Sequence, residues 1–143
     1  MNSIKMTTIA LLILLAGSSC VSEQEHSRNQ KALGFYREWK YDQAVVVAQE
    51  ALDAAEANVG PDHPDVATSL YNLAWLYETQ GDYAKAEPLY KRSLAIDEKA
   101  LGPGHPTVAA SLQTLARLYR ATKRDKEAPE LEKRAERIWA IQR

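Results

Sequence analysis

The sequence predicts an all-α protein, a short solenoid of about three helix-turn-helix units, and three observations predict it. Twelve of the eighteen residues in 60–77 recur 42 positions later, in 102–119. Apolar residues within each copy recur at helical spacing, and segments that contain Gly and Pro separate the copies. Such self-similarity is typical of stacked supersecondary units, which bury a shared core against their neighbours. We therefore expect an extended binding surface rather than a single buried active site.

The middle unit, 61–102, shows the pattern of one helix pair. Its first half carries apolar side chains at i, i+4, i+7, i+8 and i+11, namely Val66, Leu70, Leu73, Ala74 and Tyr77. Gly81 then suits the left-handed residue that ends a helix, and Asp82 offers an N-cap oxygen to the next helix. A second apolar stripe continues toward Leu101. We expect a helix, a short turn and a second helix, followed by the connector 102–106.

The same register extends to a weaker first unit over 29–60 and to a third unit over 103–143. The first unit has Arg28 and Lys31 where the other units have Leu, as suits a terminal repeat whose outer face meets water. The closing segment of the third unit, 127–143, is charged over most of its length, so we expect it to cap the array. Pro88 removes one backbone donor inside the expected second helix of the middle unit, which predicts a local bend there.

These residues resemble a known family. The stretch LAWLYETQGDYAKAEPLYKRSLAIDEKALGPGHPTVA is similar to a tetratricopeptide repeat of the kinesin light chain type, with its period of 42 residues. The family's small-residue positions correspond to Ala32, Ala44, Ala51, Ala74, Ala86, Ser93, Ala116, Ala128 and Ala135. The resemblance covers about 29–138 and implies a right-handed solenoid whose concave surface is lined by the first helix of each unit. It implies a protein or peptide partner and no cofactor.

The resemblance also implies which side chains face a partner. The candidate partner-binding residues are Tyr36, Tyr71, Asn72, Trp75, Gln113, Arg117 and Arg120. The two strong copies differ at these positions amid matching sequence: Tyr71 aligns with Gln113, and Trp75 with Arg117. A recognition surface would show this divergence, and so would free drift at exposed positions.

Each of these candidate residues suits a particular kind of contact with a partner. Asn72 matches a family position whose amide commonly holds a peptide backbone. Tyr71 and Trp75 are rigid aromatic anchors, which are frequent hot-spot residues. Arg117 and Arg120 are suited to a carboxylate or an acidic segment of the partner.

The N-terminal residues 1–19 resemble a signal peptide. One Lys precedes the apolar run 6–16, which spans about 16 Å as a helix, against the roughly 30 Å of a bilayer core. Small residues follow this run, as in secretory signals. Ser18 and Ser19 before Cys20 resemble a bacterial lipobox, although Gly17 stands where that motif most often has Leu. The alternatives are cleavage after Ser18 or Ser19, which gives a soluble exported protein, and an incidental thiol.

A lipobox implies a lipid anchor on Cys20, a linker over 20–28 and a repeat domain over 29–143. Cys20 is the single cysteine of the chain, and lipidation would explain why an exported protein carries an unpaired thiol. Val21 follows it, and in a Gram-negative host the absence of Asp at that position favours an outer-membrane lipoprotein that faces the periplasm.

The formal net charge of −1 gives no indication of nucleic-acid binding. The charge is uneven, however: residues 21–112 carry 8 basic and 14 acidic side chains, whereas residues 113–143 carry 9 basic and 5 acidic ones. The basic end could steer an acidic partner, or it could be a solvated terminal helix whose cations interact with the helix dipole.

Little in the sequence suggests catalysis or metal binding. His63 and His105 precede Pro in equivalent connectors, which indicates repeat structure rather than a metal pair. Residues 97–99 are expected to form a solvated helix face, and no nucleophile–base set can be identified. We therefore expect no enzyme activity.

The favoured hypothesis is a membrane-tethered interaction module or adaptor of the bacterial cell envelope, which binds a peptide or helix in its concave groove. The alternative is a structural subunit that assembles through the ends of the solenoid. The sequence leaves the oligomeric state open.

Overall fold

The computed structural model describes residues 27–32, 34 and 40–142. Its helices in the later part of the chain are α3 (Tyr41–Val59), α4 (Pro64–Thr79), α5 (Tyr83–Leu101), α6 (Pro106–Ala121) and α7 (Ala128–Ile141). Residues 27–32 are also helical, and there is no strand in the described ranges. The expected signal peptide, Cys20 and Tyr36 lie outside the described residues.

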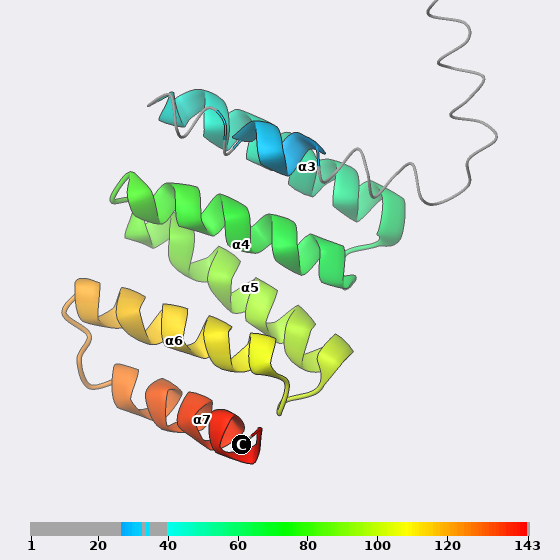
Figure 1. Ribbon diagram of the computed structural model, residues 1–143. Helices are drawn as coiled ribbons and strands as arrows, with labels where there is room; N and C mark the ends of the chain where they lie inside the picture. Colours follow the sequence, from blue (N-terminus) through cyan, green and yellow to red (C-terminus); the bar gives the residue numbers. More distant parts are fainter. Residues whose placement is uncertain (1–26, 33, 35–39, 143) are drawn as a thin grey trace, which may run out of the picture.

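The helices stack in chain order, so the fold is the predicted all-α solenoid. Each helix packs against the next one, from α3 to α7. Figure 1 shows α3 at one end of the stack and α7 at the other. None of the helices in the described residues is long and apolar enough to cross a membrane.

The connectors between the units recur because the same residues make the same hydrogen bonds in each. Gly60 has a φ of 88°, and its N–H donates to the Glu56 carbonyl at 3.1 Å, which ends α3. The Nδ1 of His63 then accepts the backbone N–H of Asp65 at 3.2 Å and caps α4, with Pro64 in the first turn. The same three roles recur 42 residues later in Gly102, His105 and Pro106. Both histidines are therefore helix caps, as their repeat positions indicate.

The turn inside the middle unit also forms as predicted. Gly81 has a φ of 80°, and the Asp82 carboxylate accepts the Lys85 backbone N–H at 3.3 Å at the start of α5. In the third unit Lys123 stands in place of Gly81 and still has a φ of 60°. A side chain in this left-handed region is strained, so the third unit keeps the turn at an energetic cost.

The small-residue positions of the family form the centre of the core. All nine are buried, from Ala32 at 3% exposure to Ala135 at 0%. Small side chains let the two helices of each pair approach closely, and Tyr90, at 2% exposure, fills the wider gap between α4 and α6. α5 continues through Pro88 to Leu101.

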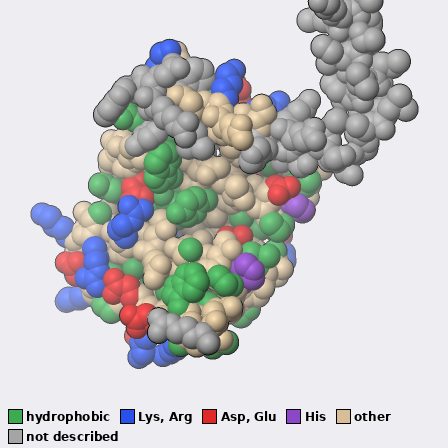
Figure 2. All heavy atoms as spheres, in the orientation of Figure 1, with side chains coloured by type: hydrophobic (Ala, Val, Ile, Leu, Met, Phe, Trp, Pro, Cys, Tyr) green, Lys and Arg blue, Asp and Glu red, His purple; other side chains and the backbone are tan. Residues whose placement is uncertain are grey.

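The uneven charge of the sequence has a structural reason. Basic side chains of the third unit pair with carboxylates of the middle unit: Arg117 with Glu78 at 3.1 Å, Arg124 with Glu87 at 2.7 Å and Arg134 with Glu98 at 2.6 Å. The pair Glu56–Arg92 occupies the same repeat positions one unit earlier. Figure 2 shows blue and red side chains intermixed near the turn between α6 and α7. Much of the positive excess is therefore balanced by acids of the preceding repeat.

Candidate partner-binding site

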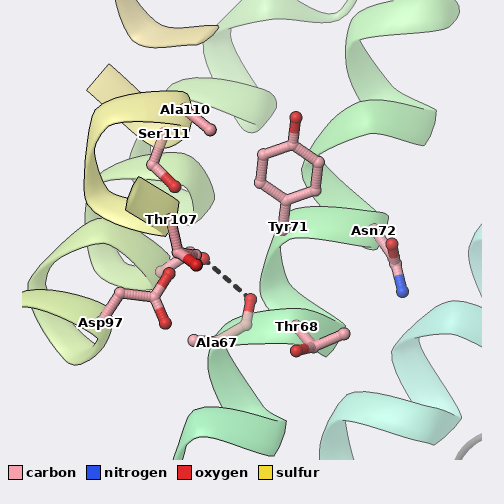
Figure 3. Close-up of a pocket in the computed structure, with 9 residues that line it drawn as sticks. Ala67, Thr68, Tyr71, Asn72, Asp97, Thr107, Ala110 and Ser111 are labelled. Carbon is pink, nitrogen blue, oxygen red and sulfur yellow. Dashed lines mark hydrogen bonds between the residues drawn. The ribbon is translucent and has the colours of Figure 1, made fainter. Parts of the chain in front are cut away.

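A pocket of about 250 Å³ lies between α4 and α6, with α5 beneath it. We call it the α4–α6 pocket, and Figure 3 shows the residues that line it. They are Ala67, Thr68, Tyr71 and Asn72 of α4, Ser93 and Asp97 of α5, and Thr107, Ala110 and Ser111 of α6. The pocket therefore opens between the first helices of two consecutive repeats, on the surface that the resemblance implies.

Tyr71 links the two first helices. Its hydroxyl lies 3.2 Å from the Thr114 hydroxyl on α6, and its ring meets the Tyr90 ring edge-on, with centroids 5.1 Å apart. Tyr90 in turn donates to the Glu78 carboxylate at 2.8 Å. Burial, together with the neighbouring Glu78, raises the pKa of Tyr90, so its hydroxyl stays protonated and remains a donor. Tyr71 is thus held in place before any partner arrives.

Asp97 lies at the floor of the pocket and corrects the expectation of a solvated face over 97–99. The residue is only 7% exposed, and burial raises the pKa of Asp97, an effect that His105 partly opposes. Its neighbours differ: Lys99 is exposed and pairs with Asp62 at 2.7 Å, whereas Glu98 pairs with Arg134. Helical spacing turns position 97 inward, and residues 97–99 were wrongly grouped because three adjacent charges look alike in sequence.

The sequence held one signal that would have revealed Asp97. The equivalent positions in the first and third units are Ala55, which is fully buried, and Trp139, which is half-buried. An acid at a position that is apolar in the other two units indicates that its surroundings differ from those in the other units.

The predicted partner-binding residues divide into two groups. Tyr71 and Asn72 line the pocket together. Trp75, Gln113, Arg117 and Arg120 are not among its lining residues. Trp75 is half-buried and packs against two core clusters, so it supports the fold, and Gln113 is exposed.

Both predicted arginines already have partners. Arg117 donates to Glu78 at 3.2 Å, and Arg120 makes two hydrogen bonds to Glu132 at 2.7 and 2.8 Å. A partner carboxylate would have to compete with these internal carboxylates.

No group of three or more His, Cys, Asp or Glu side chains that could hold a metal ion occurs among the residues that the structure describes.

Comparison with known proteins identifies the repeat. The tetratricopeptide repeat family model matches residues 23–99 and 80–140. Nephrocystin-3 of Xenopus laevis is 43% identical over 51 residues, which are 36% of this chain and 4% of that protein. Nephrocystin-3 of Mus musculus is 45% identical over 51 residues, with the same coverage. The chain thus spans only a small part of these curated relatives.

The solved structures agree in fold. A Podosopora anserina protein described as a kinesin light chain with nearly identical TPR-like repeats gives a TM-score of 0.73 at 27% identity, over 82% of this chain and 56% of that chain. BtubC (BKLC) from P. vanneervenii gives a TM-score of 0.77 at 22% identity, over 87% of this chain and 49% of that chain. The chain therefore belongs to the tetratricopeptide repeat family, and its helices stack as in kinesin light chain repeat proteins.

Proposed function

We propose that this protein is a membrane-tethered interaction module or adaptor of the bacterial cell envelope, which binds a peptide or helix of a partner protein between α4 and α6. The observation that carries the proposal is the α4–α6 pocket, where Tyr71 and Asn72 of α4 line one hollow together with residues of α6, the first helix of the next repeat. Repeat proteins of this family generally act as non-enzymatic scaffolds, and a groove between helices suits an extended segment or a helix.

The proposed location rests on the sequence before the repeats. A basic start, a short apolar run and small residues before Cys20 support export and lipidation. We expect Cys20→Ala to release the protein from membranes and to abolish labelling by a radioactive fatty acid. A wild-type protein that takes up no label, or a variant that stays membrane-bound, would remove the lipid anchor from the proposal.

The structure suggests sharper variants for the groove than a Trp75 substitution. Trp75 packs against two core clusters, so its loss would also disturb the fold. Asn72 is half-buried at the pocket and makes no side-chain hydrogen bond among the described residues, so Asn72→Arg should block the pocket while the solenoid stays folded. Ala95→Arg adds the same side chain at an exposed position of α5 outside the pocket and is the matched control.

The experiment is crosslinking of the full chain in living cells of its own host, with circular dichroism as the test of folding. We expect Asn72→Arg to lose a captured partner that the wild type and Ala95→Arg both retain. Equal capture by all three proteins would contradict the use of this groove.

One observation favours the alternative of assembly through the solenoid ends. Val46 on α3 is 57% exposed, and Ile141 at the end of α7 is 79% exposed, so both outer helices present an apolar side chain. If this assembly is the function, Val46→Lys or Ile141→Lys should lose the captured partner while Asn72→Arg retains it.

A further inference from the structure

The carboxylate of Asp97 differs from the other carboxylates at the repeat interfaces. Glu56, Glu78, Glu87 and Glu98 each pair with an arginine. Asp97 is only 7% exposed and lines the open α4–α6 pocket, and its side chain makes no hydrogen bond or ion pair within the described part of the chain. A carboxylate that is largely withdrawn from water normally pairs with a cation or a set of donors.

The scaffold itself does not require an acid here. The same position holds Ala55 in the first unit and Trp139 in the third, and the second helix forms in both units as α3 and α7. A side chain that is unfavourable for folding and unnecessary for the repeat suggests a role toward a ligand.

The surroundings of Asp97 suit one kind of ligand. Its carboxylate and the hydroxyls of Thr107 and Ser111 line the α5 and α6 sides of the pocket, as Figure 3 shows. Neither hydroxyl makes a side-chain hydrogen bond among the described residues. Together the three groups offer acceptors for an ammonium, which carries three donors. Ala67, Ala110 and the Tyr71 ring supply apolar walls for a methylene chain.

We propose that the α4–α6 pocket binds the cationic end of a lysine side chain from the partner, with Asp97 as its counter-ion. This inference rests on the proposed function, since it names the chemistry of the partner residue that enters the groove. His105 does not already fill this role, because its Nδ1 is used by the Thr107 backbone N–H at 3.2 Å, and no hydrogen bond or ion pair joins His105 to Asp97 among the described residues.

The test is an NMR titration of the isotope-labelled full chain in an uncharged maltoside detergent, which offers no cation of its own. The probe is Nα-acetyl-lysine methylamide, and the matched control probe is the norleucine analogue, which has the same kind of stem without the ammonium. We expect saturable shifts of the Asp97, Thr107 and Ser111 amide signals with the lysine probe in the millimolar range. Norleucine should give no saturable shift at these signals.

Two variants complete the test. Asp97→Asn should weaken binding of the lysine probe at least about tenfold, since a charge-assisted hydrogen bond is lost. Asp53→Asn removes an equal charge at an exposed position of α3 and should bind like the wild type. Equal shifts with norleucine, or unchanged affinity in Asp97→Asn, would overturn the inference.

The outcome is distinguishable from failure of the proposed function. If the lysine probe does not bind but Asn72→Arg still loses its partner in cells, the lysine pocket is wrong and the groove remains the working surface. If the probe binds but Asn72→Arg retains the partner, the pocket stands and the proposed use of the groove is wrong.

Discussion

Replacing Asp97 by Ala should stabilise the free protein, which is the opposite of what most substitutions of buried residues do. Asp97 is only 7% exposed as a residue, and the variant removes its carboxylate, which makes no hydrogen bond or ion pair among the described residues. Burial of a polar group without a hydrogen bond costs about 1–3 kcal/mol in protein mutational data. Ala also has a higher helix propensity than Asp, by roughly 0.5 kcal/mol. Ala55 shows that the repeat accepts Ala at this position, where it is fully buried.

The expected gain is therefore about 1–3 kcal/mol in the free energy of unfolding. For a domain of this size, 1 kcal/mol corresponds to a shift of about 4 °C in Tm, so the transition should move upward by at least that amount. The carboxylate lines a pocket that is open to solvent, so water places the gain toward the lower end of this range, and removal of the carboxylate leaves no closed cavity.

The measurement is thermal and urea unfolding of the full chain by circular dichroism, with Asp53→Ala as the control. Asp53 is exposed and accepts one hydrogen bond from Gln49 at 2.8 Å, so its substitution should change stability by no more than about 0.5 kcal/mol. A loss of stability in Asp97→Ala would refute the reasoning, because it would mean that the carboxylate has an internal partner and is kept for the fold.

Four further predictions follow from the same contacts. Asp97→Asn should be more stable than the wild type above the raised pKa of Asp97, and this difference in the free energy of unfolding should vanish below about pH 3.9, the pKa of an unperturbed Asp. The reason is that the folded wild type binds more protons than its unfolded state only between these two pKa values. Urea unfolding over a pH series measures the difference, and a difference that does not change with pH would contradict the prediction. Lys123→Gly should raise the free energy of unfolding by about 1 kcal/mol because it relieves the φ of 60°, whereas Gly81→Lys should lower it; equal effects of both variants in thermal unfolding would refute this. Glu78→Ala leaves the Tyr90 hydroxyl and Arg117 without their acceptor, so a loss of about 1–3 kcal/mol is expected, and a double-mutant cycle with Tyr90→Phe should show coupling. His105→Ala should lose about 1 kcal/mol through the missing cap of α6, and His105→Asn should recover most of it; equal stability of the two variants would show that the cap is unimportant.

The repeat architecture was predictable from the amino-acid sequence alone. Periodicity and turn chemistry placed the helices within a few residues, because each helix end depends on local features: Gly81 and Gly102 at positive φ, and Asp82 as an N-cap. The nine small positions were predicted from the resemblance to the repeat family, and all nine are buried. The helix pairs are local structures, and local structure is what sequence spacing describes.

The structure brings only some of the predicted partner-binding residues to the α4–α6 pocket. The resemblance assigns Tyr71 and Asn72 to the inner face of a first helix, and both line this pocket, while their role in partner binding stays a prediction. Arg117 and Arg120 were expected to be available to a partner, but their pairing with Glu78 and Glu132 depends on how helices distant in sequence lie against each other. The prediction that Asp97 lies on a solvated face was wrong for the same reason.

Which charged side chains meet across the repeats depends instead on how the helices pack. Spacing places a side chain on one face of its own helix, but it does not say which residues of the next repeat lie opposite that face. Pairing between repeats joins Glu78 to Arg117 and Glu98 to Arg134, whereas Asp97 makes no such pair among the residues that the structure describes. Burial then makes that difference important, because a charge that is harmless at an exposed position becomes unfavourable when it is removed from water.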